Sequence, residues 1–329
     1  MSHPKLHPDI LAIDCEAEAK RIAQRMVEIV ARELHRRGVV IALSGGVDSS
    51  VCAALAVRAF GTSKIYALLL PEQDSSSSSL TRATRVANQF GIPYGVEDIA
   101  PTLEALGCYR LRDEAIRAVF PRYGPDWKSK IAIAGGREGS YNYFKLVVQS
   151  PEGGLQEKRL PLREYLQIVA ATNFKQRVRK TIEYFHADRL NYCVIGTPNR
   201  LEYDQGFFVK NGDGAADLKP IAHLYKTQVY AMARHQEIPE EICNAAPTTD
   251  TYSLQQGQDE FYFALSYDKM DVALWAYNHG VPEADLASFL GIPAAQASFI
   301  YKDIVAKRQA TRYLHARPVL VEPVAEISV

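Results

Sequence analysis

The sequence has 329 residues, of which 47% are hydrophobic and 23% are charged, and 38 Lys and Arg balance 38 Asp and Glu. This composition excludes a disordered, collagen-like or coiled-coil chain, and the length suffices for one large α/β domain or two smaller ones. No apolar run approaches the roughly 20 residues that a membrane-spanning helix needs, and residues 1–10 contain no signal-peptide core. We therefore expect a cytoplasmic protein without membrane contact, and its zero net charge argues against nucleic-acid binding.

The first part of the chain alternates helix-like and strand-like patterns. Apolar residues at helical spacing predict a helix over 14–37, and the wholly apolar run 39–43 predicts a strand buried on both faces. The next predicted elements are a helix over 49–60, a strand over 65–70, a polar loop over 71–79, a helix over 80–90 and a strand over 92–96. This alternation indicates βαβ units, and therefore an α/β fold with a doubly wound, mostly parallel sheet flanked by helices.

Residues 100–160 fit this alternation less well, and we interpret them as an insertion. Inside it, the stretches 143–148 and 155–160 flank a Pro-Glu-Gly-Gly turn, which predicts a β-hairpin. The serine run 75–79 is most simply a flexible surface loop, although its place after a strand leaves open a mobile lid. Five widely spaced cysteines without a CxxC pair indicate reduced thiols.

The rest of the chain completes the predicted architecture. A long helix over 162–187 leads to a strand over 192–196, and the residues from 257 onward have a mainly helical pattern. We predict a single domain over 1–317, with the insertion at about 100–160, a helical C-terminal part and an extended tail over 318–329.

The strongest chemical signal is the loop Ser-Gly-Gly-Val-Asp-Ser-Ser at 44–50, between a predicted strand and a helix. Its glycines let backbone N–H groups converge on an anion, and the helix adds the positive end of its dipole. The lysine of a Walker A loop and the dinucleotide-binding glycine spacing are both absent. The loop predicts a phosphate site, and the carboxylate of Asp48 among phosphates predicts Mg²⁺. A capped Gly-Gly turn is the plainer alternative.

This loop resembles that of the PP-loop ATP pyrophosphatases, which grip the β- and γ-phosphates of ATP and cleave between the α- and β-phosphates. Further motifs occur in the order and approximate spacing of the ammonia-dependent NAD synthetases within that group. They are Asn-Phe-Lys-Gln-Arg-Val-Arg at 173–179, Gly-Thr at 196–197, Glu202, Gly-Phe-Phe-Val-Lys at 206–210, Gly-Asp-Gly-Ala-Ala-Asp at 212–217, Leu-Tyr-Lys at 224–226 and Pro-Thr-Thr-Asp at 247–250. The resemblance implies an adenine nucleotide alpha hydrolase-like, Rossmann-like fold.

The resemblance also implies roles for particular residues. The implied ATP contacts are Ser44, Gly45, Gly46, Val47, Asp48, Ser49, Thr197, Lys226 and Thr248. The implied contacts to the second substrate, nicotinic acid adenine dinucleotide, are Arg177, Lys210, Asp217 and Lys307. Asp48 and Glu202 are the implied Mg²⁺ ligands, and the implied catalytic residues are Asp48, Asp213 and Lys226.

The activity implied by the resemblance is the ATP-dependent amidation of this dinucleotide acid to NAD. An acyl-adenylate forms and releases pyrophosphate, and ammonia then displaces AMP. The resemblance further implies a homodimer. Because the sequence contains no recognisable glutaminase-like domain, we expect the nitrogen to come from free ammonia or from a separate glutaminase chain.

Two departures from the family pattern keep alternatives open. Ala-Lys-Arg at 306–308 stands where many NAD synthetases carry His-Lys-Arg, and residues 100–160 exceed the length found in compact members. The alternatives are a related amide ligase for a different carboxylate and a catalytically weak nucleotide-binding protein. Some residues also have plainer readings: Arg177 as a solvated helix face, Phe207 and Phe208 as core, and Asp213 as a turn residue.

Overall fold

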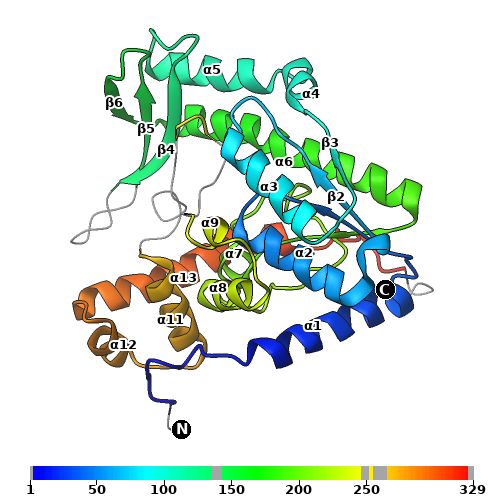
Figure 1. Cartoon of the computed structure of the whole chain (residues 1–329). Helices are drawn as coiled ribbons and strands as arrows, with labels where there is room; N and C mark the ends of the chain where they lie inside the picture. The colour runs from blue at the N-terminus through cyan, green and yellow to red at the C-terminus, as the bar shows by residue number, and fades with distance from the viewer. Residues whose placement is uncertain (1–2, 135–142, 246–251, 255–264, 325–329) are drawn as a thin grey trace.

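The computed structural model describes residues 3–134, 143–245, 252–254 and 265–324. Within them, a parallel four-stranded sheet has the order β3–β2–β1–β7 (Figure 1). These strands are β1 (Val39–Ala42), β2 (Ile65–Leu69), β3 (Tyr94–Val96) and β7 (Cys193–Ile195). The order confirms the predicted parallel sheet, and it places a topological switch point between β1 and β7, where ligands of such folds bind.

Helices cover both faces of this sheet, which confirms that it is doubly wound. Val39 and Ile41 of β1 belong to one hydrophobic core, whereas Val40 between them belongs to another. The first core is covered by α1 (Cys15–Glu28), α2 (Val47–Phe60), α3 (Ser77–Gln89), α8 (Lys226–His235) and α9 (Glu240–Cys243). The second is covered by α4 (Ala100–Ala105), α5 (Cys108–Val119) and α6 (Leu162–Leu190). Strands buried on both faces explain the wholly apolar runs of the sequence.

A separate antiparallel sheet lies at one end of α6 (Figure 1). It contains β4 (Lys128–Ala134), β5 (Tyr143–Gln149) and β6 (Leu155–Arg159). The hairpin of β5 and β6 confirms the prediction, whereas β4 was not predicted. Ile131 of β4 and Leu146 of β5 are buried against α5 and α6, so this sheet has a small core of its own.

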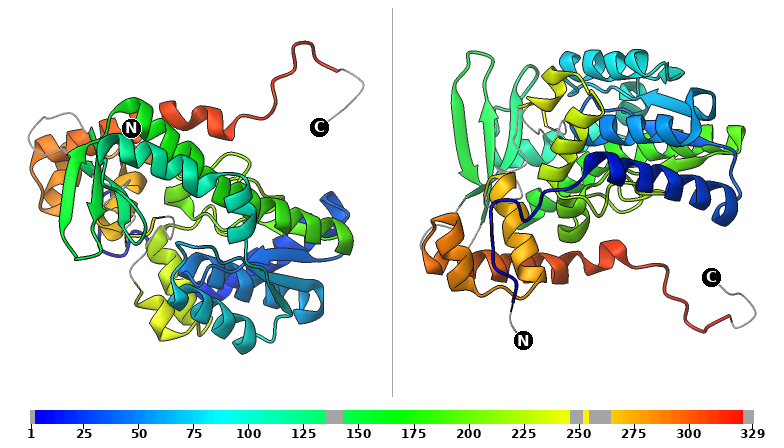
Figure 2. Two further views of the ribbon diagram at one scale, coloured as in Figure 1. Left: turned by 90° about the horizontal axis from the view of Figure 1, so that it is seen from above. Right: turned by 60° about the horizontal axis from the view of Figure 1, so that its bottom comes forward.

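The C-terminal part is helical, as predicted, and packs around its own core. Its helices are α11 (Tyr267–Asn278), α12 (Glu283–Leu290) and α13 (Ala294–His315), with α7 (Arg200–Gln205) beside them. Residues 316–324 are exposed and run away from the body of the molecule (Figure 2). Among the described residues, no helix is long and apolar enough to cross a membrane. All five cysteines are free.

Two helices begin earlier than the sequence predicts. Helix α2 starts at Val47, inside the phosphate-loop motif, so the loop leads directly into the helix. Helix α3 starts at Ser77 because the Ser76 hydroxyl accepts the Ser79 N–H and caps it. The interpretation of the serine run as a flexible surface loop is therefore wrong, since its serines cap and begin a helix.

Candidate active site

A cavity of about 690 Å³ lies at the carboxyl ends of β1 and β7. The loop 44–49, which follows β1, lines it, as do Thr197 and Pro198, which follow β7. This is the switch point of the sheet, and the sequence places its phosphate-loop motif there because that motif directly follows the first buried strand. The cavity is therefore the candidate active site.

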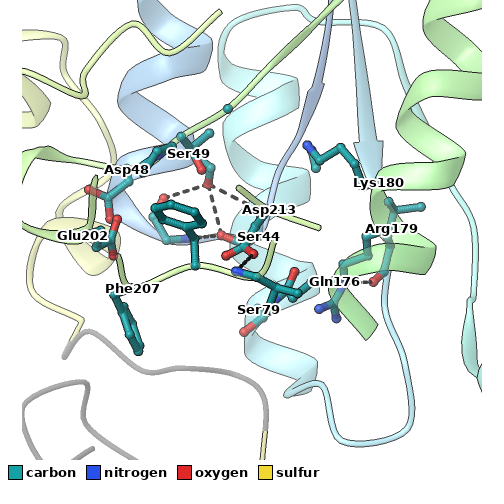
Figure 3. A pocket seen from close by; sticks show the side chains of 18 of the residues that line it. Ser44, Asp48, Ser49, Ser79, Gln176, Arg179, Lys180, Glu202, Phe207 and Asp213 are labelled. Carbon is teal, nitrogen blue, oxygen red and sulfur yellow. Dashed lines mark hydrogen bonds between the residues drawn. The ribbon is translucent and has the colours of Figure 1, made fainter. Parts of the chain in front are cut away.

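The phosphate loop has a strained backbone that only glycine accommodates well. Gly45 has a φ of 78°, and a Cβ there would lie 2.4 Å from the carbonyl oxygen of Ser79. The hydroxyls of Ser44 and Ser49 are 3.2 Å apart, and Ser49 also donates to the carbonyl of Gly46 at 3.1 Å (Figure 3). This arrangement holds the loop close to the N-terminus of α2, where an anion is favoured.

Acidic residues lie on one side of the loop, and a buried lysine neutralises part of their charge. The ammonium of Lys226, at the start of α8, forms an ion pair with Asp48. Asn199 donates from Nδ2 to Asp48 at 3.1 Å, and its backbone N–H donates to Glu202 at 3.2 Å. Asn199 also caps α7 through Oδ1, so this one fully buried residue fixes both acids.

When both are ionised, the two acids provide more negative charge than Lys226 offsets. Burial and the charge of Asp48 raise the pKa of Glu202 to about 8. Figure 3 shows the two carboxyl groups beside one another at the cavity wall. Carboxylate oxygens are suitable ligands for Mg²⁺, which takes one or two from the protein and the rest from phosphates and water. The pair therefore fits a divalent cation, and the described residues contain no larger cluster of His, Cys, Asp and Glu.

Cations line the other side of the cavity. Arg177, Arg179 and Lys180 project from α6, and Lys180 is paired with Glu183 at 2.7 Å. Arg82 of α3 donates to the carbonyl of Gly45 at 3.1 Å and so ties the phosphate loop to α3. In Figure 3, Arg179 and Lys180 lie across the cavity from Asp48 and Glu202, an arrangement that suits a polyanion bound beside a metal ion.

The glycine-rich segment 206–214 closes a further side of the cavity. Asp213 accepts the backbone N–H of Val209 at 2.7 Å, and although it is exposed to the cavity, desolvation raises the pKa of its carboxyl. Lys210 donates to the carbonyl of Tyr313 at 2.8 Å, which ties the segment to the end of α13. Phe207 and Phe208 are half-buried and line the cavity, so they are not simply core residues.

The cavity brings together most of the residues that the sequence predicts as site residues. Its lining contains Ser44, Gly45, Gly46, Val47, Asp48, Ser49, Arg177, Thr197, Glu202, Lys210, Asp213 and Lys226. Thr248 lies outside the described residues.

Asp217 and Lys307 do not line the cavity. The two carboxylate oxygens of Asp217 accept the Tyr184 hydroxyl at 3.1 Å and the Val194 N–H at 2.8 Å, so Asp217 links α6 to β7. Lys307 pairs with Asp303 at 2.6 Å on the same helix. Contacts of Asp217 and Lys307 with substrate stay predictions, because neither side chain reaches the cavity in this chain.

Sequence reasoning missed Arg82, Asn199 and Lys180. Asn199 comes shortly after β7, so its position near the carboxyl end of a parallel strand was an available signal. Arg82 lies inside α3, where its sequence position gave no such signal. Lys180 lies one residue after the Arg-Val-Arg motif on the same helix. None of the three stands out by residue type alone.

A buried ionic cluster supports the wall behind the α6 cations. Lys175 of α6 contacts Glu72 at 2.9 Å and Asp74 at 2.6 Å, and Arg112 of α5 contacts Asp74 at 2.5 Å. The Tyr109 hydroxyl donates to the second oxygen of Glu72 at 2.9 Å. Glu72 and Asp74 lie between β2 and α3, so this buried cluster fixes the segment that leads to the cavity-lining Ser79 and Arg82.

The fold and the site define a class: an α/β protein with a candidate polyphosphate site at the switch point of its sheet. The family model "NAD synthase" matches residues 19–119 and 147–314, and the chain belongs to this family of ATP-using carbon–nitrogen ligases. It is 58% identical over 320 residues to a protein of Rhizobium meliloti named NH(3)-dependent NAD(+) synthetase, covering 97% of this chain and 96% of that one.

Other similar proteins agree with this assignment. A Thermotoga maritima protein of the same name is 36% identical over 241 residues, covering 73% of this chain and 79% of that one. The structure of an NH3-dependent NAD synthetase from Campylobacter jejuni superposes with a TM-score of 0.62 at 21% identity, covering 94% of this chain and 100% of that one. At that identity the structural likeness supports the fold alone. Membership of the family confirms the resemblance that the sequence motifs carry.

Proposed function

We propose that the protein amidates nicotinic acid adenine dinucleotide to NAD with ATP and ammonia, releasing AMP and pyrophosphate. The observation that carries this proposal is that the phosphate loop, the Asp48–Lys226 pair, Glu202 and the cations of α6 line one cavity. A reaction that joins a carboxylate to a triphosphate brings like charges together, and the site must stabilise them electrostatically.

In the first step, a carboxylate oxygen of the acid attacks the α-phosphorus of ATP, and the bond to the β-phosphate oxygen breaks. The leaving pyrophosphate gains negative charge next to the loop 44–49 and the N-terminus of α2. The ammonium of Lys226, which is 1% exposed, adds a positive charge there. Arg177 and Lys210 are assigned to the dinucleotide acid because both are cationic and line the same cavity as the loop.

In the second step, ammonia attacks the acyl carbon, the bond to AMP breaks, and the nitrogen loses a proton. We assign this proton to Asp213, because it lines the cavity and desolvation there raises the pKa of its carboxyl. A raised pKa makes a carboxylate a better proton acceptor. Thr197, which follows β7, is assigned to ATP.

Asp48 and Glu202 would hold Mg²⁺, because their carboxyl groups meet at the cavity wall beside the phosphate loop. The ion supplies charge neutralisation of the phosphates when it is bound. Asn199 keeps both acids oriented through its bonds to each of them. Substitution of the Asn199 side chain would remove the bond to Asp48 and the cap of α7, whereas the backbone N–H that bonds to Glu202 would remain.

The decisive experiment gives the purified protein ATP, Mg²⁺ and ammonium with a panel of acids, and measures AMP and amide together. We expect stoichiometric AMP and NAD with the dinucleotide acid. Asp48→Asn, which preserves the shape of the side chain, should lose most of this activity. Absence of AMP with every acid would contradict the proposal and favour a nucleotide-binding protein.

One observation favours including other acids in the panel. The family match omits residues 120–146, yet Phe144 from this segment lines the cavity and stacks on Tyr165 at 4.2 Å between ring centroids. A wall residue outside the family match can change which acid fits. The panel therefore includes nicotinic acid mononucleotide, which has the same carboxylate without the adenylate half. A preference for this acid would support the alternative amide ligase.

We further propose a cytoplasmic homodimer. Exposed apolar residues at the start of α6 support a protein interface, since Leu162 and Leu166, one turn apart, are 71% and 55% exposed. Light scattering after size exclusion would test this. Ammonium and glutamine are supplied in parallel to the purified protein: amide from ammonium shows direct use of ammonia, and amide from glutamine alone would contradict it.

A further inference from the structure

Helix α8 begins without an ordinary N-cap. Its N-cap position is Tyr225, which has no short polar side chain to accept the first backbone N–H groups. Ser, Thr, Asp and Asn usually fill this position because their oxygens reach those groups. The first residue of α8 is Lys226, so the geometry of this helix end sets the position of the site lysine.

Another helix supplies the missing cap. Asp271 of α11 accepts the backbone N–H of Thr227, the second residue of α8, at 2.7 Å. Asp271 is 0% exposed, and among the described residues its Oδ1 atom has no hydrogen-bond partner. A buried carboxylate with an unsatisfied oxygen is costly, so capping alone would be served better by a serine or aspartate at position 225.

The same face of α11 also contacts the lysine side chain. Tyr267, one turn before Asp271, has its ring centroid 5.5 Å from the Lys226 ammonium, and Tyr230 of α8 lies 5.8 Å away on its own helix. Lys226 therefore lies between α11 and the phosphate loop, where it pairs with Asp48. The main-chain end and the side chain of Lys226 are both held by the C-terminal helical part.

We propose that Asp271 is a positioning residue that fixes the first turn of α8 and thereby holds the Lys226 ammonium against Asp48 and the triphosphate. The inference rests on the proposed function, because it assigns Lys226 to the phosphates of ATP. Asp271 itself does not line the cavity. Its effect must therefore pass through Lys226.

A double-mutant cycle tests this dependence. Asp271→Ala should raise KM for ATP about tenfold, as expected when an ionic contact loses its geometry, and leave KM for the acid unchanged. In a Lys226→Met background, the same substitution should change KM for ATP by less than about twofold. Asp271→Asn, which keeps an acceptor for the Thr227 N–H, should restore KM for ATP to within about threefold of the parent.

Asp14→Ala is the matched control, because Asp14 caps α1 by accepting the Ala17 N–H at 3.0 Å and does not line the cavity. It should lower thermal stability while KM for ATP stays unchanged. The inference would be overturned if the effects of Asp271→Ala and Lys226→Met on KM for ATP multiply in the double mutant. It would also be overturned if Asp271→Ala changes KM for ATP and KM for the acid equally. If the parent forms no AMP, the proposed function fails, and the same cycle run on the Kd of ATP by calorimetry still decides the role of Asp271.

Discussion

The structure allows us to work out how much stability is lost when the buried lysine behind the cavity wall, Lys175, is substituted. Lys175 is 0% exposed and contacts Glu72, also 0% exposed, and Asp74, which is 6% exposed. Lys175→Met removes the charge with little change of volume and leaves Glu72 as a buried carboxylate without this partner. Removal of one partner from a buried ion pair costs about 3–5 kcal/mol of unfolding free energy.

Urea unfolding followed by circular dichroism measures this loss. With a slope of about 3 kcal/mol per molar urea, the midpoint should fall by about 1 M or more. Glu72→Gln in the Lys175→Met background removes the uncompensated charge, so about 2 kcal/mol should return. Asp74 retains Arg112 in both variants.

Arg110→Met is the matched control for an ion pair outside the core. Arg110 pairs with Glu114 at 2.8 Å, but the two side chains are 61% and 45% exposed. This control should cost less than about 0.5 kcal/mol. A Lys175→Met effect no larger than that of Arg110→Met, or a double variant less stable than the single one, would refute the reasoning.

Three further predictions concern the cavity. Gly45→Ala should weaken ATP binding, measured by calorimetry, more than about tenfold, because its Cβ would lie 2.4 Å from the Ser79 carbonyl oxygen. The control Gly61→Ala, at φ 68° with no atom within 4 Å of its Cβ, should leave ATP binding unchanged. Because the pKa of Glu202 is raised to about 8, this carboxyl loses its proton as pH rises. The Kd of Mg²⁺-ATP should therefore fall from pH 6.5 to 8.5, and a flat profile, or an equally steep one in Glu202→Gln, would contradict this assignment. Removal of Mg²⁺ with EDTA should abolish AMP formation and excess Mg²⁺ should restore it; AMP formation that persists in EDTA would exclude a required metal.

The sequence predicts the central sheet because β1, β2 and β7 are buried on both faces. The apolar run 39–43 therefore stands out without knowledge of its partners. β4 was missed because Lys128, Ser129 and Lys130 give it a polar start, and its pairing with β5 is what makes it a strand. The start of α3 was missed because a serine run has the composition of a loop, and only the cap at Ser76 distinguishes it.

The site residues were predicted where one local motif contains them. The loop 44–49 follows a strand, so its chemistry is readable from consecutive residues. Asn199 and Asp48 are far apart in the sequence, and their contact exists only because β1 and β7 are neighbours in the sheet. Asp217 matches the family motif, yet its side chain bonds to Tyr184 and the backbone of β7 and does not line the cavity.

The phosphate loop is attached to more than one hydrophobic core, and this has a consequence for distant substitutions. Arg82 ties Gly45 to α3, whereas Lys226 ties Asp48 to α8 and, through Asp271, to the C-terminal helices. The core of those helices is separate from the core beneath the sheet. Loosening the C-terminal core therefore displaces the Lys226 contact while the loop backbone, held by Arg82 and α2, stays in place. We therefore expect that loss of packing in that core, for example at Leu274, weakens ATP binding before the sheet unfolds.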